Sequence, residues 1–250
     1  MLHRSLRSCL GVLGMLMAIQ ATASISLSST RIIFDGTQKE ANITVRNGSQ
    51  NVLIQSWVDG AQTNAATAPF AVTPPLAKML ANEHQLLRIL FAGTGLPTDK
   101  ESVFWLNVQE IPQASTKVNI LQLAVRQRIK IFFRPANLPG DARQAPEQLE
   151  WQLTDHSGKT VLRVNNPSRY HVSMADIELQ DGSRSKSIVK STMIAPGALE
   201  TFALNSQLSD NTLRLTFGNI NDYGVKNEYN VTVNRTGTSH ARIIAPLPSP

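Results

Sequence analysis

The sequence predicts an all-β protein of two antiparallel β-sandwich domains. From residue 24 onward, apolar residues alternate with polar ones, which is the period of a half-buried strand, and no segment has a convincing helical period. Turn-forming residues interrupt the alternation every ~8 to 12 residues, as in sandwich proteins. The chain has 250 residues, more than one ordinary domain needs and enough for two domains of about 110 residues each.

Residues 1–23 are typical of an export signal. His3, Arg4 and Arg7 form a basic start, an apolar run follows at 10–19, and the small residues Ala-Thr-Ala at 21–23 suit a signal peptidase. The apolar run is too short to span a bilayer, which takes about 20 residues. A buried N-terminal helix is the alternative, but no later segment pairs with one. We expect cleavage after residue 23 and a soluble, exported product.

The composition is that of a globular protein, with 42% hydrophobic and 17% charged residues. It excludes a disordered chain, a collagen-like repeat and a coiled coil. The single cysteine, Cys9, lies in the export signal, so an intramolecular disulfide and a cysteine-based zinc site are excluded. The net charge of +6 indicates an acidic or carboxylate-bearing partner and falls short of a nucleic-acid-binding surface.

The expected strands fall into two groups. A segment at 134–140 with two prolines and a glycine separates them, and we take it as the interdomain junction. The last residues, rich in proline, are expected to form a loose tail. The first group is expected at 31–34, 40–46, 52–58, 85–91, 102–110 and 118–133. The second group is expected at 149–154, 160–164, 170–178, 199–204, 212–217 and 228–233.

The sequence contains no recognisable enzyme or metal-binding motif. It has no Gly-x-Ser-x-Gly elbow, phosphate-binding loop, dinucleotide glycine fingerprint or His-Glu-x-x-His. The five histidines, at 3, 84, 156, 171 and 240, lack metal-ligand spacing. Sequence order alone leaves a serine triad open, although chance sets of its residue types are common. We expect no enzyme, no cofactor and no metal, because a hydrolase on a sandwich scaffold would need a catalytic set that is not identifiable.

The stretch at 118–133 is long for a strand and apolar on both faces. Strand alternation places Leu121, Leu123 and Val125 on one face, and further apolar residues lie on the other. Ordinary strands have about 5 or 6 residues. Either this strand is central and covered on both sides, or one of its faces awaits a partner.

Two basic residues lie within or beside apolar runs. Lys130 is flanked by Ile129 and Ile131, and Arg31 precedes an Ile-Ile-Phe run. A cation in such a place either reaches solvent or is paired with a negative group. Taken singly, each fits a solvated charge at a strand end. Together, near a domain junction, they indicate a receptor for a carboxylate.

Six motifs then follow one another along the chain: TRIIFDG (30–36), PPLAKML (74–80), ESVFWLNVQEIP (101–112), RQRIKIFFRP (126–135), VNNPSRYHV (164–172) and NINDYG (219–224). In order and spacing they resemble the periplasmic pilus chaperones of the chaperone–usher pathway, which assembles surface fimbriae in Gram-negative bacteria. The resemblance covers essentially the whole chain after the export signal. FWLNVQEIP and RIKIFFRP in tandem are its most specific part.

The resemblance implies two immunoglobulin-like β-sandwich domains arranged in an L with a cleft between them. The N-terminal domain would occupy 24–138, the C-terminal domain 139–238 and a flexible tail 239–250. No cofactor is implied.

The same resemblance implies three sets of functional residues. Arg31 and Lys130 would bind the terminal carboxylate of a pilus subunit in the cleft. Glu101, Arg134 and Asp222 would form an interdomain salt bridge that fixes the angle of the L. The donor strand completes the open sandwich of the subunit, and its contact residues would be Asn119, Leu121, Leu123 and Val125.

The implied protein is a periplasmic chaperone that stabilises pilus subunits and delivers them to an outer-membrane usher, with no role for nucleic acid. Self-association of the free protein through the donor strand is left open. The short segment between Pro112 and Asn119 and the lack of a cysteine pair imply the short-loop branch, associated with thicker, rod-like pili. The alternative is a secreted immunoglobulin-like structural subunit or adhesin, in which the long strand is simply central.

One geometric question stays open at this point. The three apolar donor-strand residues have odd numbers and Lys130 an even one, so an ideal strand places the two functions on opposite faces. Strong twist or a β-bulge near 126–128 could bring them together.

Overall fold

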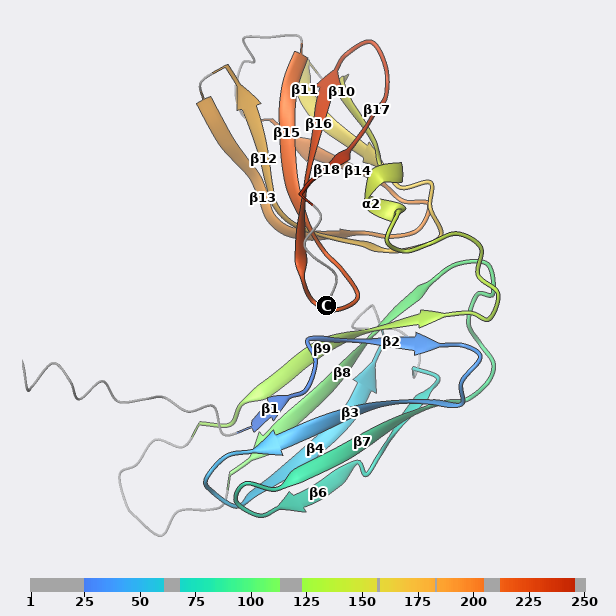
Figure 1. Cartoon of the computed structure of the whole chain (residues 1–250), viewed down its shortest axis with the longest axis vertical. Helices are drawn as coiled ribbons and strands as arrows, with labels where there is room; N and C mark the ends of the chain where they lie inside the picture. The colour runs from blue at the N-terminus through green and yellow to red at the C-terminus, as the bar shows by residue number, and fades with distance from the viewer. Residues whose placement is uncertain are drawn as a thin grey trace, which may run out of the picture.

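The computed structural model describes residues 25–60, 68–112, 123–156, 158–182, 184–204 and 212–245. They form two β-sandwich domains, one above the other in Figure 1, that are joined at one side. The prediction of an all-β fold with two sandwich domains is confirmed. Within the described ranges a short helix, α2 (Ala145–Gln148), follows the interdomain junction. None of the helices in these ranges is long and apolar enough to cross a membrane.

The N-terminal domain packs a four-stranded sheet against a five-stranded one. The strand orders are β1-β3-β7-β5 and β2-β9-β8-β4-β6. The strands are β1 (Ile25–Leu27), β2 (Arg31–Asp35), β3 (Glu40–Asn47), β4 (Val52–Asp59), β5 (Phe70–Thr73), β6 (Leu76–Met79), β7 (His84–Phe91), β8 (Ser102–Ile111) and β9 (Arg126–Arg134).

Strand alternation builds the core between these two sheets. In β2, Ile32 and Phe34 are buried while the residues between and beside them are not. Phe34 packs against Phe133 of β9, with ring centroids 5.6 Å apart, and Phe133 in turn packs against Phe91 at 4.5 Å. The residues on either side of each buried position therefore point to the outer face of the sheet, where they are available for contacts outside the core.

The C-terminal domain repeats this architecture around its own core. Its strand orders are β14-β11-β10-β17 and β13-β12-β15-β16-β18. The fully buried Trp151 packs against Phe217 at the centre, with ring centroids 5.3 Å apart. The strands are β10 (Glu150–His156), β11 (Lys159–Asn165), β12 (Val172–Asp181), β13 (Arg184–Ile194), β14 (Leu199–Ala203), β15 (Thr212–Ile220), β16 (Lys226–Asn234), β17 (Ser239–His240) and β18 (Arg242–Ala245).

Strand β9 differs from the long strand expected at 118–133. It begins at Arg126 and has 9 residues; residues 123–125 precede it without being part of the strand, and 113–122 lie outside the described residues. The described end of this apolar stretch, 123–125, therefore precedes the strand and does not belong to it. Pairing also differs along β9, because β2 pairs in parallel only with 130–134, whereas β8 pairs with 126–133.

Several strands were not predicted from the sequence pattern. Strands β1, β5 and β6 have three or four residues, too few to show alternation. Strand β13, missed altogether, is rich in serine and lysine. Strands β17 and β18 lie within 239–245, where we expected a loose tail. There they pair with β10 and β16, while 246–250 lie outside the described residues.

The N-terminal core yields a stability prediction. Leu106 on β8 is fully buried, whereas Leu86 on β7 is 49% exposed. Leu106→Ala should destabilise the N-terminal domain by about 2–5 kcal/mol, because it removes buried methyl groups and leaves a cavity. Leu86→Ala is the matched control and should change stability by less than about 0.5 kcal/mol. Urea unfolding measures both, and equal losses would contradict this assignment of the core.

Candidate functional site: the junction between the domains

The parallel pairing of β2 with β9 places the two singled-out cations side by side. In the register of the pair, Arg31 is opposite Lys130, and Ile32 is opposite Ile131. The two isoleucines are buried in the core, so the two cations lie together on the outer face of the sheet. The two cations are 99 positions apart in the sequence, and a single ladder of hydrogen bonds brings them together.

Neither of these cations has an acidic partner within the described ranges. Arg31 Nη1 donates to the Ile220 carbonyl of the C-terminal domain at 2.7 Å, while its buried Nε has no hydrogen-bond partner. Lys130 Nζ lies over the ring of Trp105, 5.7 Å from its centroid. The two charges are thus oriented by a carbonyl and an aromatic ring, without being neutralised.

The environment makes both positive charges costly. Burial lowers the pKa of Lys130, and the neighbouring charge of Arg31 lowers it further. Burial also lowers the pKa of Arg31, while the charges of Asp222 and Glu101 act to raise it. Two partly desolvated cations at adjacent positions stabilise an anion placed between them, most effectively one with two acceptor oxygens.

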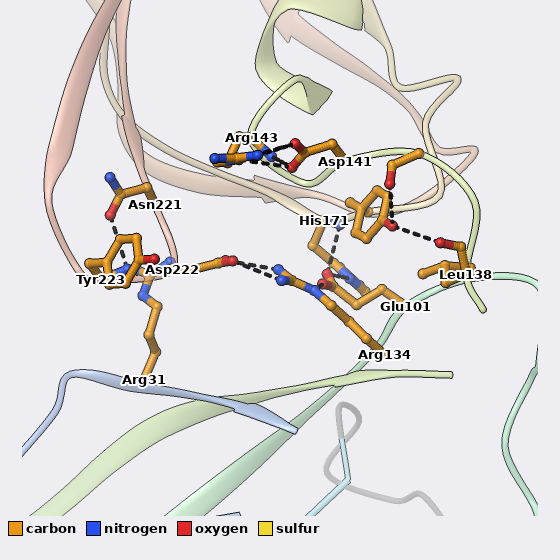
Figure 2. A network of polar contacts seen from close by, with 12 residues as sticks. Arg31, Glu101, Arg134, Leu138, Asp141, Arg143, His171, Asn221, Asp222 and Tyr223 are labelled. Carbon is orange, nitrogen blue, oxygen red and sulfur yellow. Dashed lines mark hydrogen bonds and ion pairs between the residues drawn. The ribbon is translucent and has the colours of Figure 1, made fainter. Parts of the chain in front are cut away.

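A third cation on the same face, Arg134, is fully paired and joins the two domains (Figure 2). Its Nε donates to Glu101 Oε2 at 2.8 Å, and its Nη1 and Nη2 donate to the two oxygens of Asp222 at 2.7 and 2.8 Å. Glu101 and Arg134 belong to the N-terminal domain, whereas Asp222 lies on the turn between β15 and β16. Although burial opposes it, the hydrogen bonds and charges of Asp222 and Glu101 raise the pKa of Arg134.

His171 completes this network and was missed by the sequence reasoning. The fully buried Glu101 accepts the backbone N–H of His171 at 2.8 Å and lies 2.9 Å from its ring Nδ1. The spacing of the histidines argues only against a metal-binding role for His171, and the position of this residue within the VNNPSRYHV motif is the signal that could have identified it. Its contact with Glu101 gives the buried carboxylate partners from both domains, which satisfies a group that would otherwise be costly to bury.

A pocket of about 330 Å³ lies at the junction and is lined by both domains. Arg31, Phe132 and Arg134 line it from the N-terminal domain, and Asp222 and Tyr223 line it from the C-terminal domain. Figure 2 shows Arg31 and Arg134 pointing from the N-terminal domain toward the turn that carries Asp222 and Tyr223. A ligand bound by Arg31 would therefore contact both domains.

The proposed donor-strand residues are only partly described. Asn119 and Leu121 lie outside the described residues, whereas Leu123 and Val125 are 71% and 41% exposed. Glu110 N donates to the Val125 carbonyl at 2.9 Å, which continues the ladder of β8 one residue beyond the start of β9. The apolar side chains next to β9 are therefore open to a partner.

The ladder between β8 and β9 also answers the question of faces. Its register is unbroken from Arg126 to Phe133, so no β-bulge lies between the start of β9 and Lys130. By alternation, Val125 shares the face of the buried Ile131, and Lys130 lies on the opposite face. A bulge near 126–128 is thus excluded as the means of bringing the two functions together.

Comparison with known proteins identifies the family. The model described as "Pili and flagellar-assembly chaperone, PapD N-terminal domain" matches residues 24–139, and "Pili assembly chaperone PapD, C-terminal domain" matches residues 144–231. The chain belongs to the PapD-like family of pilus-assembly chaperones. The resemblance read from the six motifs is therefore confirmed, and fimbrial chaperones of this kind in Gram-negative bacteria are periplasmic.

Individual relatives agree with this assignment. The probable fimbrial chaperone LpfB of Escherichia coli O157:H7 is 41% identical over 206 residues, which cover 80% of this chain and 84% of LpfB. The solved structure of the YadV chaperone is 37% identical with a TM-score of 0.72, and the match covers 84% of this chain and 100% of that one. The SafB chaperone, solved with the SafA pilin of Salmonella enterica, shares the fold at 24% identity with a TM-score of 0.69, over 90% and 98% of the two chains.

The interdomain network yields a second prediction. Glu101→Ala would leave Arg134 and the His171 N–H without their buried acceptor. We expect a loss of about 3–5 kcal/mol, as when one partner of a buried ion pair is removed. The comparison is Asp155→Ala, which removes an exposed ion pair with Arg235 inside the C-terminal domain and should change the unfolding midpoint little. Guanidinium unfolding measures both, and equal midpoints for the two variants would contradict the prediction.

Proposed function

We propose that this chain is exported by a cleaved signal at 1–23 and works in the periplasm. There it binds fimbrial subunits at the junction between its domains and delivers them to an outer-membrane usher. The observation that supports this most directly is the Arg31–Lys130 pair, two adjacent, partly buried cations without an acidic partner in the part of the chain that the structure describes. The SafB chaperone, which shares the fold, was solved with a pilin.

The free carboxylate at the C-terminus of a subunit suits these two cations. It carries one negative charge on two oxygens, so each oxygen can accept from a different cation. Its charge would relieve the repulsion between Arg31 and Lys130 and offset the cost of their burial. Charge-assisted hydrogen bonds of this kind contribute about 1.5–3 kcal/mol each.

The exposed edge of β9 would supply the second part of the interaction. Residues 126–129 pair with β8 but not with β2. Among the described strands their other edge is therefore unpaired, with backbone donors and acceptors that an added strand could bind. Next to this edge, Leu121, Leu123 and Val125 would fill the groove of a subunit that lacks one strand of its sandwich. The same edge is available to a second copy of the chaperone when no subunit is bound.

The carboxylate-binding residues and the apolar donor-strand residues lie on opposite faces of β9, and this placement is compatible with the proposed mode of binding. A subunit strand added beside β9 runs along its edge, between the two faces. Its neighbours in the subunit would cover the face with Leu123 and Val125, while its terminal carboxylate would turn to the face with Arg31 and Lys130. A shift of one residue would turn every anchor to the wrong face, so binding of the carboxylate also sets the register.

The remaining sequence expectations belong to the same proposal. Glu101, Arg134 and Asp222 would fix the angle between the domains and so the shape of the site. The short segment before the donor strand, outside the described residues, would assign the chain to the short-loop branch. The relatives are named chaperones, which favours this function over the secreted structural subunit or adhesin that the sequence left open.

The charge of Lys130 can be separated from its bulk. Lys130→Met should raise the thermal midpoint of the free chaperone at neutral pH, because a desolvated charge beside Arg31 is replaced by an apolar side chain. Co-purification with the fimbrial subunit encoded beside it should be lost. Lys39→Met, at an exposed position in the turn after β2, should change neither. Retention of the subunit by Lys130→Met would contradict the carboxylate receptor.

The stabilisation by Lys130→Met should also depend on pH. The folded protein holds the pKa of Lys130 below its ordinary value of 10.5, so between the two values the unfolded state binds more protons. The stability of the wild type should therefore rise as the pH increases through this window. The difference from Lys130→Met, largest at neutral pH, should shrink toward pH 10.5, as thermal midpoints measured across the range would show.

The donor-strand contacts are tested by Leu123→Ser. Because Leu123 is 71% exposed in the free chain, the substitution should leave thermal stability unchanged. It should weaken subunit capture about tenfold or more, since a buried leucine contributes about 1.5–3 kcal/mol. Leu199→Ser, at an exposed leucine of the C-terminal domain, is the matched control and should capture subunits normally. Equal capture by both variants would remove Leu123 from the binding surface.

A further inference from the structure

The turn between β15 and β16 is held against the N-terminal domain at three points. Arg134 binds the Asp222 carboxylate with two hydrogen bonds, and Arg31 donates to the Ile220 carbonyl at 2.7 Å. Gly224 lies against the residue before β2, so closely that a Cβ atom at this position would be 2.5 Å from Thr30 Oγ1. The turn of the C-terminal domain thus rests directly on the start of the strand that carries Arg31.

This turn is internally rigid. The Asn221 side chain accepts the backbone N–H groups of Tyr223 and Val225, both at 3.0 Å. The Asn221 N–H donates to the Val225 carbonyl at 2.9 Å, and its carbonyl accepts from Gly224 at 3.0 Å. Gly224 has a φ of +81°, which favours glycine. Because these bonds tie 221–225 together, a force that holds Asp222 also holds the adjoining Ile220 carbonyl.

The Ile220 carbonyl in turn determines how Arg31 presents its charge. A guanidinium is planar and has its five N–H donors in a fixed fork, so an acceptor bound at one end orients the whole group. In the described structure this carbonyl is the acceptor of the guanidinium, and the Nε–H remains unpaired. The guanidinium also lies over the Phe132 ring, 5.7 Å from its centroid. Without the carbonyl, the group would keep this ring contact but lose the hydrogen bond that fixes the direction of its donors.

We propose that Asp222 is a positioning residue for subunit recognition: through the rigid turn and the Ile220 carbonyl, it holds Arg31 in the orientation that accepts a carboxylate. The receptor is then complete only when the two domains are docked. This inference rests on the proposed function, and adds to the role of the salt bridge in fixing the interdomain angle. Because linkage is reciprocal, a bound carboxylate also strengthens the contact between the domains.

The test has to separate positioning of Arg31 from a general change of domain angle. A changed angle would weaken every contact with the subunit, whether or not its C-terminus is charged. Loss of the Arg31 orientation would weaken only recognition of the charge. The informative quantity is therefore the ratio of affinities for two peptides with the sequence of the last strand of the fimbrial subunit, one ending in a free carboxylate and one in an amide.

We would measure this ratio by calorimetry with the full mature chain as wild type, Asp222→Asn and Asp155→Asn. Asp222→Asn keeps the shape of the side chain but removes its charge. We expect its preference for the acid peptide to fall about tenfold, toward that of Arg31→Ala, with affinity for the amide peptide kept within about twofold. Asp155→Asn removes the carboxylate of an ion pair within the C-terminal domain and should behave as wild type.

The possible outcomes are distinguishable. Equal weakening of both peptides by Asp222→Asn would overturn the inference and leave the salt bridge a role in the domain angle alone, and an unchanged ratio would overturn it as well. A wild type without preference for the acid peptide would instead refute the proposed carboxylate receptor. If Asp222→Asn unfolds, Gly224→Ala provides a second route, since its Cβ displaces the turn from Thr30 without changing a charge, and it should lower the same ratio.

Discussion

The parallel register between β2 and β9 is the constraint on which the other features of the site depend. It is the one parallel pairing among the described strands, and it joins only the second half of β9. This partial pairing places Arg31 beside Lys130 and, among the described strands, leaves the edge of 126–129 unpaired. A β2 shifted by one residue would put Arg31 on the core face, and a longer β2 would cover the edge. The proposed carboxylate receptor and the proposed binding edge for a subunit strand therefore both follow from this one register.

Two cations on one face of β9 differ in whether they are paired with acids. Lys130 and Arg134 are four positions apart and so point the same way. Arg134 is neutralised by acids from both domains, while Lys130 has none in the described chain and a lowered pKa. In the described chain, the carboxylates at this junction thus bind Arg134 between the domains, and Lys130 remains available for the proposed carboxylate ligand. Arg31 belongs to both systems, because its Nη1 contacts the C-terminal domain while its Nε donor has no partner in the described chain.

Sequence patterns predicted the sandwiches and singled out both cations because those features are local. Lys130 between two isoleucines is visible in any reading of the chain, and alternation identifies most strands of five or more residues. Strand pairing is not local, so the pattern could suggest that Arg31 and Lys130 act together near the domain junction, but only the family resemblance placed them in one cleft. The role of the Ile220 carbonyl could not be predicted from the sequence, because every residue has a backbone carbonyl. The start of β9 at Arg126 was missed because apolar character alone does not distinguish a residue inside a strand from one on a surface that a partner covers.

The unbroken ladder of β9 couples the positions of the two contacts in the proposed complex, the carboxylate contact and the apolar contact. Val125 and Lys130 lie on opposite faces, and the regular two-residue period relates them rigidly. An added strand whose carboxylate reaches Arg31 and Lys130 can take only one register. In that register the groove of the subunit lies against Leu123 and Val125, and a subunit that does not fit there leaves its groove unfilled. A bulge between them would have loosened this relation. The placement of Val125 and Lys130 on opposite faces is therefore no conflict. In the proposed complex, binding of the carboxylate on one face determines where the subunit groove meets Leu123 and Val125 on the other.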